Sequence, residues 1–417
     1  MIATLHDAHA IPPEVAIRHA QASAFIRTFA GGPEATSRLV SNVRTKLHAL
    51  HLALPRGQGQ SVSLPQNDWL LPVTVNSHAG RDMPCPSDPN GYVVSPITTY
   101  VHYGYDEARL LTSPWVRGAC RALLGGIHGA LAVAKADNVV ILNNWLLSTN
   151  IHPPGWLEAD CDDALRATLA AVTARWPKHA ILIRSLNYPC NHNLLQALGD
   201  TGFILCPSRQ VYLFDARPDA AASFTRTRNY LWDKRLLDKA IAPESGEYGA
   251  ETLRANSEAS IFERVAYLYG KLYLDKYSRL NPQYQPAWFR RGIEGGWLDV
   301  TLLRRRLDGR VDAAVGWFGR EDLFTTPVVG YETALPQQLG LYRMLMAITL
   351  ARAAASQAVL NLSSGAAGFK RLRGGVPAIE YTAVYARHLP IHRRAVWQTL
   401  AAMLQHVAVP LLKRHEL

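Results

Sequence analysis

A loop with anion-binding features follows a candidate strand in the second half of the chain. The strand ends at Gly330, and a helix is expected to begin near Leu339. The first turn of a helix offers unpaired backbone N–H groups and the positive end of the helix dipole, which together attract anions. Gly340 would let the backbone approach a phosphate, and Arg343 adds a positive charge one turn later. The pattern predicts a phosphate-binding loop, with a plain strand–loop–helix connection as the alternative.

Other chemistries have less support in the residue pattern. Cys190 and His192 are too close in the sequence to present a thiol and an imidazole to each other properly. No Cys-x-x-Cys and no His-Glu-x-x-His occurs, so no metal site is predicted. The glycine-rich motifs of nucleoside triphosphate and dinucleotide sites are also missing. The segment Leu362-Ser363-Ser364-Gly365 lacks the first glycine of a nucleophile elbow.

The elements that must position the loop alternate between strands and helices. Strands are expected at 69–75, 92–103, 138–142, 180–183, 210–214, 298–304, 313–318, 324–330, 358–362 and 379–385. Helices are expected at 115–135, 165–176, 261–272, 339–356 and 393–407. Leu39, Val43, Leu47 and Leu50 recur at the spacing of one helix face, which predicts a helical preamble before the first strand.

The two halves end in the same way, which predicts a repeat. A strand at 181–186, a short helix, Gly202-Phe203 and a strand at 210–214 close the first half. A strand at 358–362, a short glycine-rich segment ending in Gly368-Phe369 and a strand at 379–385 close the second. We therefore expect an α/β fold in which one layered domain occurs twice. The expected boundaries are a helical preamble at 1–58, an N-terminal domain at 59–216 and a C-terminal domain at 217–417.

Charge is concentrated in the second half. The chain has 44 basic and 33 acidic side chains, a net charge of +11. The first 208 residues hold 15 basic and 14 acidic side chains, whereas the rest hold 29 and 19. A basic half usually meets a polyanion such as nucleic acid or a phosphorylated cofactor, although a solvated basic face is the alternative.

Composition excludes several classes of protein. With 417 residues, 48% of them hydrophobic and 18% charged, the chain is neither disordered nor fibrous. Five scattered cysteines do not make a disulfide framework. No apolar run reaches the roughly 20 residues that a membrane span needs, and the N-terminus does not resemble a signal peptide. A cytoplasmic protein with no membrane span is expected.

Three motifs of the second half resemble GNAT acyltransferases. Gln337-x-x-Gly340-x-Tyr342 resembles their Gln/Arg-x-x-Gly-x-Gly/Ala pyrophosphate loop, with Tyr342 in place of the last small residue. The strand end at 361–365, then Phe369-Lys370 and Arg373-Gly374, resembles the end of the catalytic domain in Fem-type aminoacyltransferases. The segment Arg226-Thr227-Arg228-Asn229-Tyr230, followed by Lys234 and Lys239 on a basic helix, resembles the helix that opens their second GNAT domain. The motifs cover 205–390, and 60–205 is covered only by the order of its elements.

The resemblance implies two tandem GNAT-like domains with an active site between them. The reaction implied is transfer of an acyl or aminoacyl group to an amine. The residues implied for the donor are Gln337, Gly340, Tyr342, Arg343, Phe369, Arg228 and Arg373. Those assigned to the acceptor are Tyr331, Asn361, Ser363 and Tyr100, with burial in a strand as the alternative for Tyr100.

Such a transfer needs a donor or cation beside the oxyanion and an acceptor for the proton of the amine. Lys370 is the candidate cation, by the resemblance and by its position at a strand–helix exit, with a surface lysine as the alternative. Glu332 is a candidate base that could instead cap the loop. Tyr273 shares a helix face with Tyr269 and Tyr277, so it is either a phenol of the site or part of the core.

The predicted function is an N-acyltransferase that uses acyl-CoA or an acyl group on a carrier protein as a phosphate-bearing co-substrate. Its acceptor would be a small-molecule amine, of specialised metabolism for example, and no tightly bound cofactor or metal is expected. Aminoacyl-tRNA is the alternative donor, because Tyr342, Arg228 and Phe369-Lys370 favour tRNA. A non-catalytic nucleic-acid-binding protein is the further alternative, in which Trp232 and Trp317 would stack on bases.

Overall fold

A computed structural model provides the structure of this chain. It describes residues 1–53, 68–77, 89–109, 113–156, 161–220 and 222–415. The chain divides into two compact units, and each is described separately below. Unit 1 comprises Met1–Arg38, Asn42–Ser208 and Ile379–Leu411, and unit 2 comprises Leu39–Ser41, Arg209–Ala378 and Leu412–Leu417.

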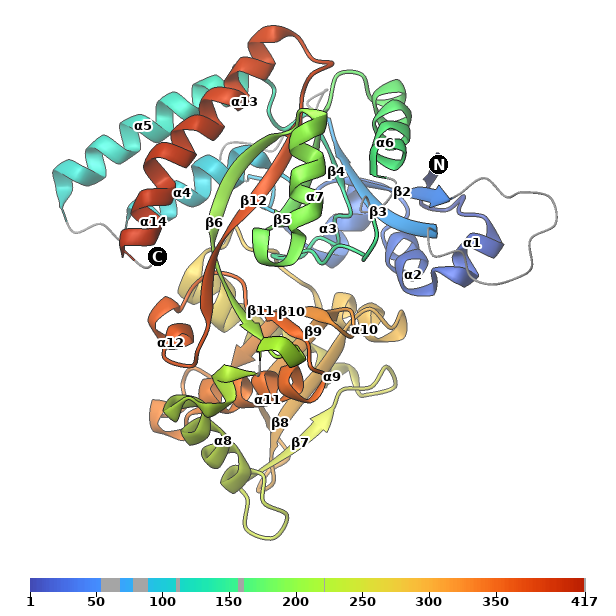
Figure 1. Cartoon of the computed structure of the whole chain (residues 1–417). Helices are drawn as coiled ribbons and strands as arrows, with labels where there is room; N and C mark the ends of the chain where they lie inside the picture. Colours follow the sequence, from blue (N-terminus) through green and yellow to red (C-terminus); the bar gives the residue numbers. More distant parts are fainter. Residues whose placement is uncertain (54–67, 78–88, 110–112, 157–160, 221, 416–417) are drawn as a thin grey trace. The chain divides into compact units, whose positions relative to one another are not determined.

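Unit 1 contains the strands β1 to β5 and helices from both ends of the chain (Figure 1). Its strands are β1 (Ile2–Asp7), β2 (Lys46–Ala53), β3 (Asp68–Asn76), β4 (Val139–Leu142) and β5 (Ala180–Leu186). Its helices are α1 (Pro13–Arg18), α2 (Ala20–Thr28), α3 (Pro33–Leu39), the π-helix η1 (Thr98–His102), α4 (Tyr103–Ala108), α5 (Pro114–Val133), α6 (Cys161–Arg175), α7 (Tyr188–Thr201), α13 (Ile391–Met403), the π-helix η6 (Leu404–Ala408) and α14 (Val409–His415). Strands β1 to β4 pair antiparallel in chain order, and β4 pairs in parallel with β5.

Unit 2 has the same order of strands. Its strands are β7 (Tyr248–Thr252), β8 (Asp299–Arg305), β9 (Val311–Gly319), β10 (Leu323–Tyr331) and β11 (Val359–Asn361). Its helices are η2 (Pro218–Ala220), η3 (Ser223–Arg226), α8 (Arg228–Ala240), α9 (Ala259–Gly270), the π-helix η4 (Lys271–Tyr277), α10 (Pro286–Glu294), η5 (Gln337–Leu339), α11 (Leu341–Ala355) and α12 (Ala367–Arg371). Strands β7 to β10 pair antiparallel in chain order, and β10 pairs in parallel with β11.

Two long strands, β6 and β12, each contain residues of both units. β6 (Ile204–Asp215) begins in unit 1 and pairs with β11 of unit 2, and β12 (Val376–Tyr385) begins in unit 2 and pairs with β5 of unit 1. The strand order is β1-β2-β3-β4-β5-β12-β6-β11-β10-β9-β8-β7. The predicted α/β class and the predicted repeat are confirmed, because each unit has four antiparallel strands followed by a parallel crossover.

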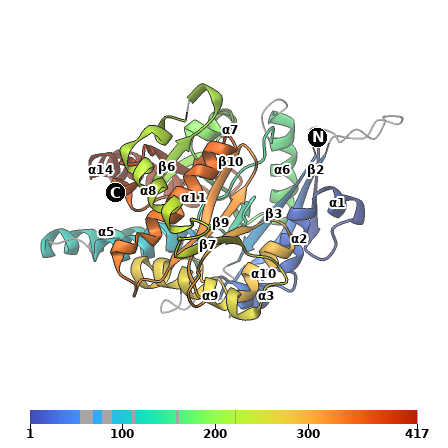
Figure 2. The ribbon, with the colours of Figure 1, turned by 90° about the horizontal axis from the view of Figure 1, so that it is seen from below.

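Apolar strands are buried on both faces, which explains their continuous hydrophobic runs. In β5, Ile181 and Ile183 pack into one core with α6 and α7, whereas Ala180 and Leu182 pack into another with α13. In unit 2, α11 lies between α8 and the strands β9 and β10, and Figure 2 shows α8 and α11 side by side. Eight residues of α11 are buried, because this crossover helix is covered on several sides.

The helix predicted through Leu39, Val43, Leu47 and Leu50 does not form, although the N-terminal segment does contain the helices α1, α2 and α3. Within the described residues 1–53, β1 and β2 flank these helices and belong to the sheet of unit 1. Leu47 and Leu50 lie in β2, which has neighbours on both edges and buries residues of both faces. Burial on both faces places buried leucines three residues apart, which imitates the spacing of a helix face. The observed units also differ from the expected boundaries, since 379–411 return to unit 1.

Two local predictions also fail. Residues 92–103, expected as a strand, form a turn and then η1, because Ser95 Oγ accepts from Thr98 N (3.0 Å) and the Asp137 carboxylate accepts from Ile97 N (3.0 Å). The two Gly-Phe pairs are not equivalent. Gly202 ends α7 in a left-handed conformation, whereas Phe369 lies inside α12.

Candidate functional site

The carboxyl end of the parallel pair in unit 2 is where the strands diverge. β11 pairs with β10 only from Leu323↔Val359 to Thr325↔Asn361. β10 then continues to Tyr331, paired with β9 on its other side, after an irregularity between Thr325 and Val328. Within the described residues, one edge of this later part of β10 therefore has no strand partner. In open sheets, ligands bind at the carboxyl ends of parallel strands.

The start of α11 lies beyond this end of β10 and has unused hydrogen-bond donors. The first backbone N–H bonded into the helix is that of Met344, which donates to Gly340 O (2.9 Å). The N-cap residue is Gly340, which has no side chain that could accept a hydrogen bond from the first turn. Among the described residues, the backbone N–H groups of Leu341, Tyr342 and Arg343 therefore have no acceptor. These groups and the dipole of a 15-residue helix form an anion-attracting end.

Gly340 is required here by the fold itself. Its φ of +68° lies in the left-handed region, and an added Cβ would lie 2.6 Å from Leu236 Cδ2 of α8. The close approach that the sequence assigned to a phosphate is therefore made by Leu236. Gln337, of the same predicted loop, is exposed in η5, and its carbonyl accepts from Gly340 N (3.0 Å).

A buried carboxylate joins two of the predicted donor-binding arginines. Asp233 of α8 accepts from Arg343 Nε at 2.6 Å and from Arg373 Nε at 2.5 Å. Arg343 keeps its other N–H groups near the start of α11, and its side chain is 41% exposed. Arg373 is buried, stacks 3.3 Å from the Phe369 ring centroid and donates to Phe369 O (2.9 Å). Arg373 is therefore held by Asp233 and Phe369, and Phe369 is half-buried beside it.

Tyrosine rings gather at the same end of unit 2. Tyr342 lies 6.0 Å from Tyr331 and 4.8 Å from Phe369, measured between ring centroids. Burial, and then the nearby phenols Tyr277 and Tyr331, raise the pKa of Tyr342. Burial and Tyr331 also raise the pKa of Tyr277. These phenols therefore stay protonated at neutral pH and can donate hydrogen bonds.

Tyr273 belongs to the neighbouring packing cluster. Its ring stacks on Tyr269 at 4.7 Å and lies 6.3 Å from Tyr277. The Tyr269 hydroxyl donates to Pro282 O at 2.8 Å. Tyr277, which the sequence analysis named only as a neighbour on this helix face, is the member of the stripe that approaches Tyr342. Its position at the end of the π-helix η4 could not be read from the four-residue spacing.

Lys370 is a buried lysine whose Nζ bonds to a backbone turn. Its Nζ donates to the carbonyl oxygens of Leu362 (2.8 Å), Ser363 (3.2 Å) and Ser364 (2.8 Å). Burial, and then the charge of Arg209, lower its pKa to about 7. An ammonium has only three protons to donate, and this turn accepts all three. The structure therefore contradicts the expected oxyanion donor and the surface lysine alike, and assigns Lys370 to holding the turn after β11.

Glu332 belongs to a buried ion-pair network. Its carboxylate accepts from Arg264 (2.9 Å), Arg310 (3.3 Å) and the backbone N–H of Ala334 (3.2 Å). Burial raises its pKa, but these donors outweigh burial, so the pKa is lowered. A carboxylate with a lowered pKa is a poor base, which argues against the predicted catalytic role and agrees with the alternative of a loop cap.

The remaining predicted residues are dispersed. Asn361 is buried and accepts from Ser363 N at 2.9 Å, so both shape the turn that Lys370 holds. Arg228 is exposed and stacks 4.2 Å from the ring of Trp232, which is 43% exposed. Trp317 is buried and cannot stack on a base. Tyr100 belongs to η1 of unit 1, where burial raises its pKa.

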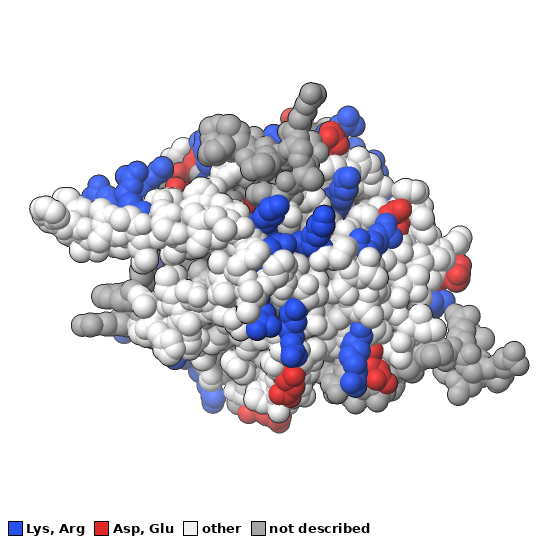
Figure 3. Space-filling model, turned by 90° about the horizontal axis from the view of Figure 1, so that it is seen from above, with Lys and Arg blue, Asp and Glu red and all other residues white. Residues whose placement is uncertain are grey.

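Sequence reasoning missed the carboxylates that organise the basic residues. Asp233 binds two arginines, and the fully buried Asp312 accepts from Arg310 (2.9 Å) and from Tyr248 (3.2 Å). A carboxylate inside a basic helix is one signal that could have pointed to Asp233. On the face in Figure 3, lysine and arginine side chains are scattered among uncharged residues.

Among the described residues, one cluster could hold a metal ion, and it lies in unit 1. His19, His51 and Asp68 place ligand atoms within 4.8 Å of one another. Asp68 Oδ1 lies 3.0 Å from His19 and 2.8 Å from His51, and Oδ2 accepts from Arg18 at 2.9 Å. In this structure Asp68 therefore contacts Arg18 and both histidines. Among the described residues, no helix is both long and apolar enough to span a membrane.

Comparisons with known proteins give similarity at the level of the fold. No family model matches the sequence, and no curated protein matches it. A solved tandem GNAT protein from the clavulanic acid biosynthesis pathway is similar over 92% of this chain and 98% of its own, with 10% identity and a TM-score of 0.39. The C-terminal domain of a putative lysylphosphatidylglycerol synthetase from Agrobacterium fabrum is similar over 59% of this chain and 78% of its own, with 14% identity and a TM-score of 0.41. FemX is similar over 57% of this chain and 79% of its own, with 10% identity and a TM-score of 0.39.

Proposed function

We propose that the chain is an N-acyltransferase that moves an acyl group from a phosphopantetheine thioester to the amine of a small molecule. The donor would be acyl-CoA or an acyl carrier protein, bound at the end of β10 and the start of α11. The observation that carries the proposal is the divergence of β10 from β11 directly before a helix start with three unused N–H groups.

The donor fits this place in two ways. The phosphates would accept hydrogen bonds from the N–H groups of Leu341, Tyr342 and Arg343, supported by the guanidinium of Arg343. The amides of the pantetheine arm would pair with the free edge of β10 between Thr326 and Tyr331, as an added strand would. Asp233 accepts from Nε of Arg343 and so orients its guanidinium, and the terminal N–H groups of Arg343 would bind the phosphates.

The phenols near the start of α11 suit the chemistry of the transfer. The amine nitrogen attacks the thioester carbonyl, the C–N bond forms and the C–S bond breaks. The phenol of Tyr331 or of Tyr342 would donate a hydrogen bond to the oxyanion and pass its proton to the leaving thiolate. The amine returns that proton to the phenol, so the products are an amide and a free thiol. Removing one such donor typically costs about 10²–10³ in rate.

An assay of thiol release with several donors tests this proposal. The chain would be incubated with candidate amines and with acyl-CoA, acyl carrier protein or charged tRNA, with and without ribonuclease. We expect amine-dependent thiol release that ribonuclease leaves unchanged, and loss of about 10²-fold in Tyr331→Phe or Tyr342→Phe. Tyr267→Phe, at an exposed tyrosine of α9, is the matched control. Transfer that occurs only from charged tRNA and stops with ribonuclease would overturn the thioester donor.

Aminoacyl-tRNA is the second candidate donor, favoured by the outer face of α8. Arg228, Trp232, Arg235 and Lys239 are exposed there, so an aromatic ring lies among basic side chains. Exposed rings among basic groups suit stacked bases and phosphates. A tRNA donor bound through several phosphates would bind less tightly by orders of magnitude between about 50 and 200 mM salt, whereas a CoA thioester would lose far less.

A further inference from the structure

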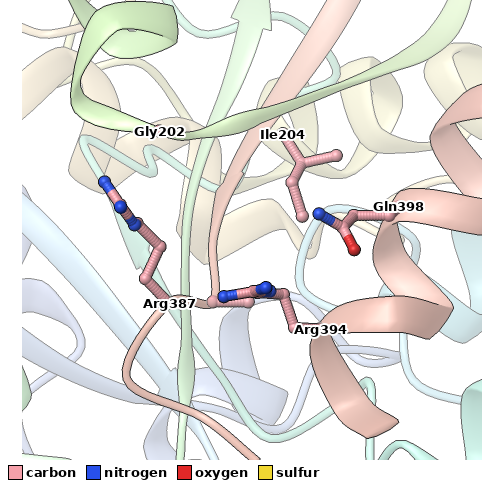
Figure 4. Close-up of a pocket in the computed structure, with 6 residues that line it drawn as sticks. Gly202, Ile204, Arg387, Arg394 and Gln398 are labelled. Carbon is pink, nitrogen blue, oxygen red and sulfur yellow. The ribbon is translucent and has the colours of Figure 1, made fainter. Parts of the chain in front are cut away.

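A small cavity in unit 1 has arginines at its wall and no carboxylate to neutralise them. The cavity measures about 260 Å³ and lies where α7 ends, β6 begins and β12 leads into α13. Its lining residues are Gly202, Ile204, Ala386, Arg387, Arg394 and Gln398. Figure 4 shows Arg394 and Gln398 extending from α13 and Arg387 rising from the preceding loop toward Gly202.

The two arginines lack the partners that arginines elsewhere in the chain have. Within the described part of the chain, neither Arg387 nor Arg394 has a carboxylate within salt-bridge distance. The Nε of Arg394 is buried and has no hydrogen-bond partner among the described residues, whereas Arg387 and Gln398 are exposed at the mouth of the cavity. The one side-chain hydrogen bond of Arg387 is long, 3.4 Å from Nη1 to Thr201 O. A buried guanidinium nitrogen without an acceptor is costly, so an acceptor from outside the chain would be bound favourably.

The preceding residue of α13 shows what a structural arginine looks like. Arg393 is buried, and its guanidinium donates to the carbonyl oxygens of Ala134 (2.5 Å), Lys178 (2.7 Å) and Lys135 (3.2 Å). Arg393 therefore fastens α13 to the segments that precede β4 and β5. Arg394 has no such task and points into the cavity instead (Figure 4).

We propose that this cavity binds a phosphomonoester group. Its polar wall is almost entirely donor: two guanidinium groups and the amide of Gln398, with no acidic side chain. A phosphomonoester carries about −1.5 to −2 charge and three acceptor oxygens, which match two guanidinium groups better than a carboxylate does. Ile204 and Ala386 add an apolar wall for the carbon attached to the phosphate. The site lies within unit 1 and is independent of the donor site proposed for unit 2.

Gly202 contributes to the shape of the cavity. Its φ is +90°, and an added Cβ would lie 2.9 Å from Cδ and from Nη1 of Arg387. The glycine therefore lets the Arg387 side chain pass close to the backbone at the end of α7. A side chain at this position would displace the guanidinium, so Gly202→Ala is a second way to disturb the site.

Calorimetric titration with simple anions tests the proposal on the full-length protein at low ionic strength. Inorganic phosphate and phosphoethanolamine serve as monoester probes, dimethyl phosphate as a diester and citrate as a polycarboxylate. We expect the monoester probes to bind, and Arg394→Gln and Arg387→Gln each to weaken them about tenfold or more. Arg166→Gln removes the same charge from an arginine of α6 that is 68% exposed, and should change binding by less than about twofold.

Each other outcome overturns the proposal. Equal binding of phosphate to Arg394→Gln and to the unchanged protein would place the anion elsewhere. Equal affinity for citrate or dimethyl phosphate would show a general attraction to negative charge. Circular dichroism and thermal unfolding of each variant verify that it is folded, and Gly202→Ala should also weaken phosphate while it keeps both arginines.

Discussion

The two parallel strand pairs, β4–β5 and β10–β11, have the same topology, but the polar groups at their carboxyl ends differ. Those of unit 1 are hydrogen-bonded within the chain, whereas some of those of unit 2 are unused. In unit 1, the segment after β4 fills this end with its own buried side chains. Asn144 donates to Thr74 Oγ1 (2.9 Å) and Val93 O (3.0 Å), and Arg184 donates to Val93 O (3.1 Å). In unit 2, the same end has the unpaired edge of β10 and the unused N–H groups of α11.

Backbone conformations reinforce the contrast. Asn143 and Leu146, which follow β4, and Ser185 in β5 have φ of +50°, +55° and +66°, although none is glycine. Such conformations cost about 1–3 kcal/mol each and persist only where the surroundings fix them. This end of unit 1 is therefore filled by residues 143–152, whose buried polar groups bond to the chain itself, and we call this segment the plug. A repeated fold can keep one copy of a site open while the other is closed by its own chain.

The largest effect is expected where a single carboxylate organises the open end. Asp233→Ala leaves the buried Arg373 without its counter-charge, and should lower the free energy of unfolding by about 3–5 kcal/mol. Asp238→Ala is the matched control, because this exposed residue of α8 pairs only with Lys234 across one helical turn and should cost about 0.5 kcal/mol or less. Urea denaturation measures both, and equal losses would remove Asp233 from its central place.

The plug of unit 1 should matter for stability and not for transfer. Asn144→Ala strips partners from Thr74, Val93 and Arg184, and should cost about 2–4 kcal/mol. Asn193→Ala, at an exposed position of α7, should stay within about 0.5 kcal/mol. Acyl transfer per folded molecule should be unchanged in both. A loss of transfer in folded Asn144→Ala would mean that unit 1 contributes to the reaction.

Lys370 should make the free energy of unfolding depend on pH. Its folded pKa of about 7 lies below the ordinary value of 10.5, so between these values the unfolded chain binds more protons than the folded one. This group therefore makes stability rise as pH increases from about 7 toward the unfolded pKa. Lys370→Met should lose about 1–3 kcal/mol through the carbonyls left unpaired, and should lack that rise. Parallel stability curves for the two proteins from pH 7 to 9 would contradict the assignment.

A smaller effect separates the close contact of Gly340 from its conformation. Gly340→Ala meets both a positive φ and Leu236, whereas Gly309→Ala meets a φ of +71° with nothing within 4 Å. Gly309→Ala should cost about 1 kcal/mol, and Gly340→Ala should cost about 1–2 kcal/mol more. Thermal unfolding of both variants measures the difference. An equal loss of stability in both variants would mean that the Leu236 side chain moves aside without a measurable penalty.

Sequence patterns were sufficient where short-range physics decides the structure. The strands at 180–183, 313–318 and 324–330 and the helix at 339–356 were predictable because continuous apolar runs and glycine breaks are local. The start of α11, with Gly340 and Arg343, was predictable for the same reason. The helix predicted through Leu47 and Leu50 failed because β2 buries both of its faces in a sheet whose other strands lie elsewhere in the sequence.

The roles of single charged residues could not be predicted because their partners are distant in the sequence. Arg343 and Arg373 look alike as free cations until Asp233, more than 100 residues earlier, is seen to bind both. Lys370 looked like a catalytic cation, and only the turn at 362–364 shows that its protons are already accepted.

The central claim is that the start of α11 in unit 2 is open to a donor whereas the corresponding end of unit 1 is filled. Hydrogen exchange at residues 341–343, compared with residues 143–152, tests it most directly. The amides of Leu341, Tyr342 and Arg343 have no acceptor in the free protein and should exchange quickly. Saturating coenzyme A should slow these three amides, because its phosphates would accept their hydrogen bonds, and should leave residues 143–152 unchanged. Slowed exchange at 143–152 with no change at 341–343 would contradict the account.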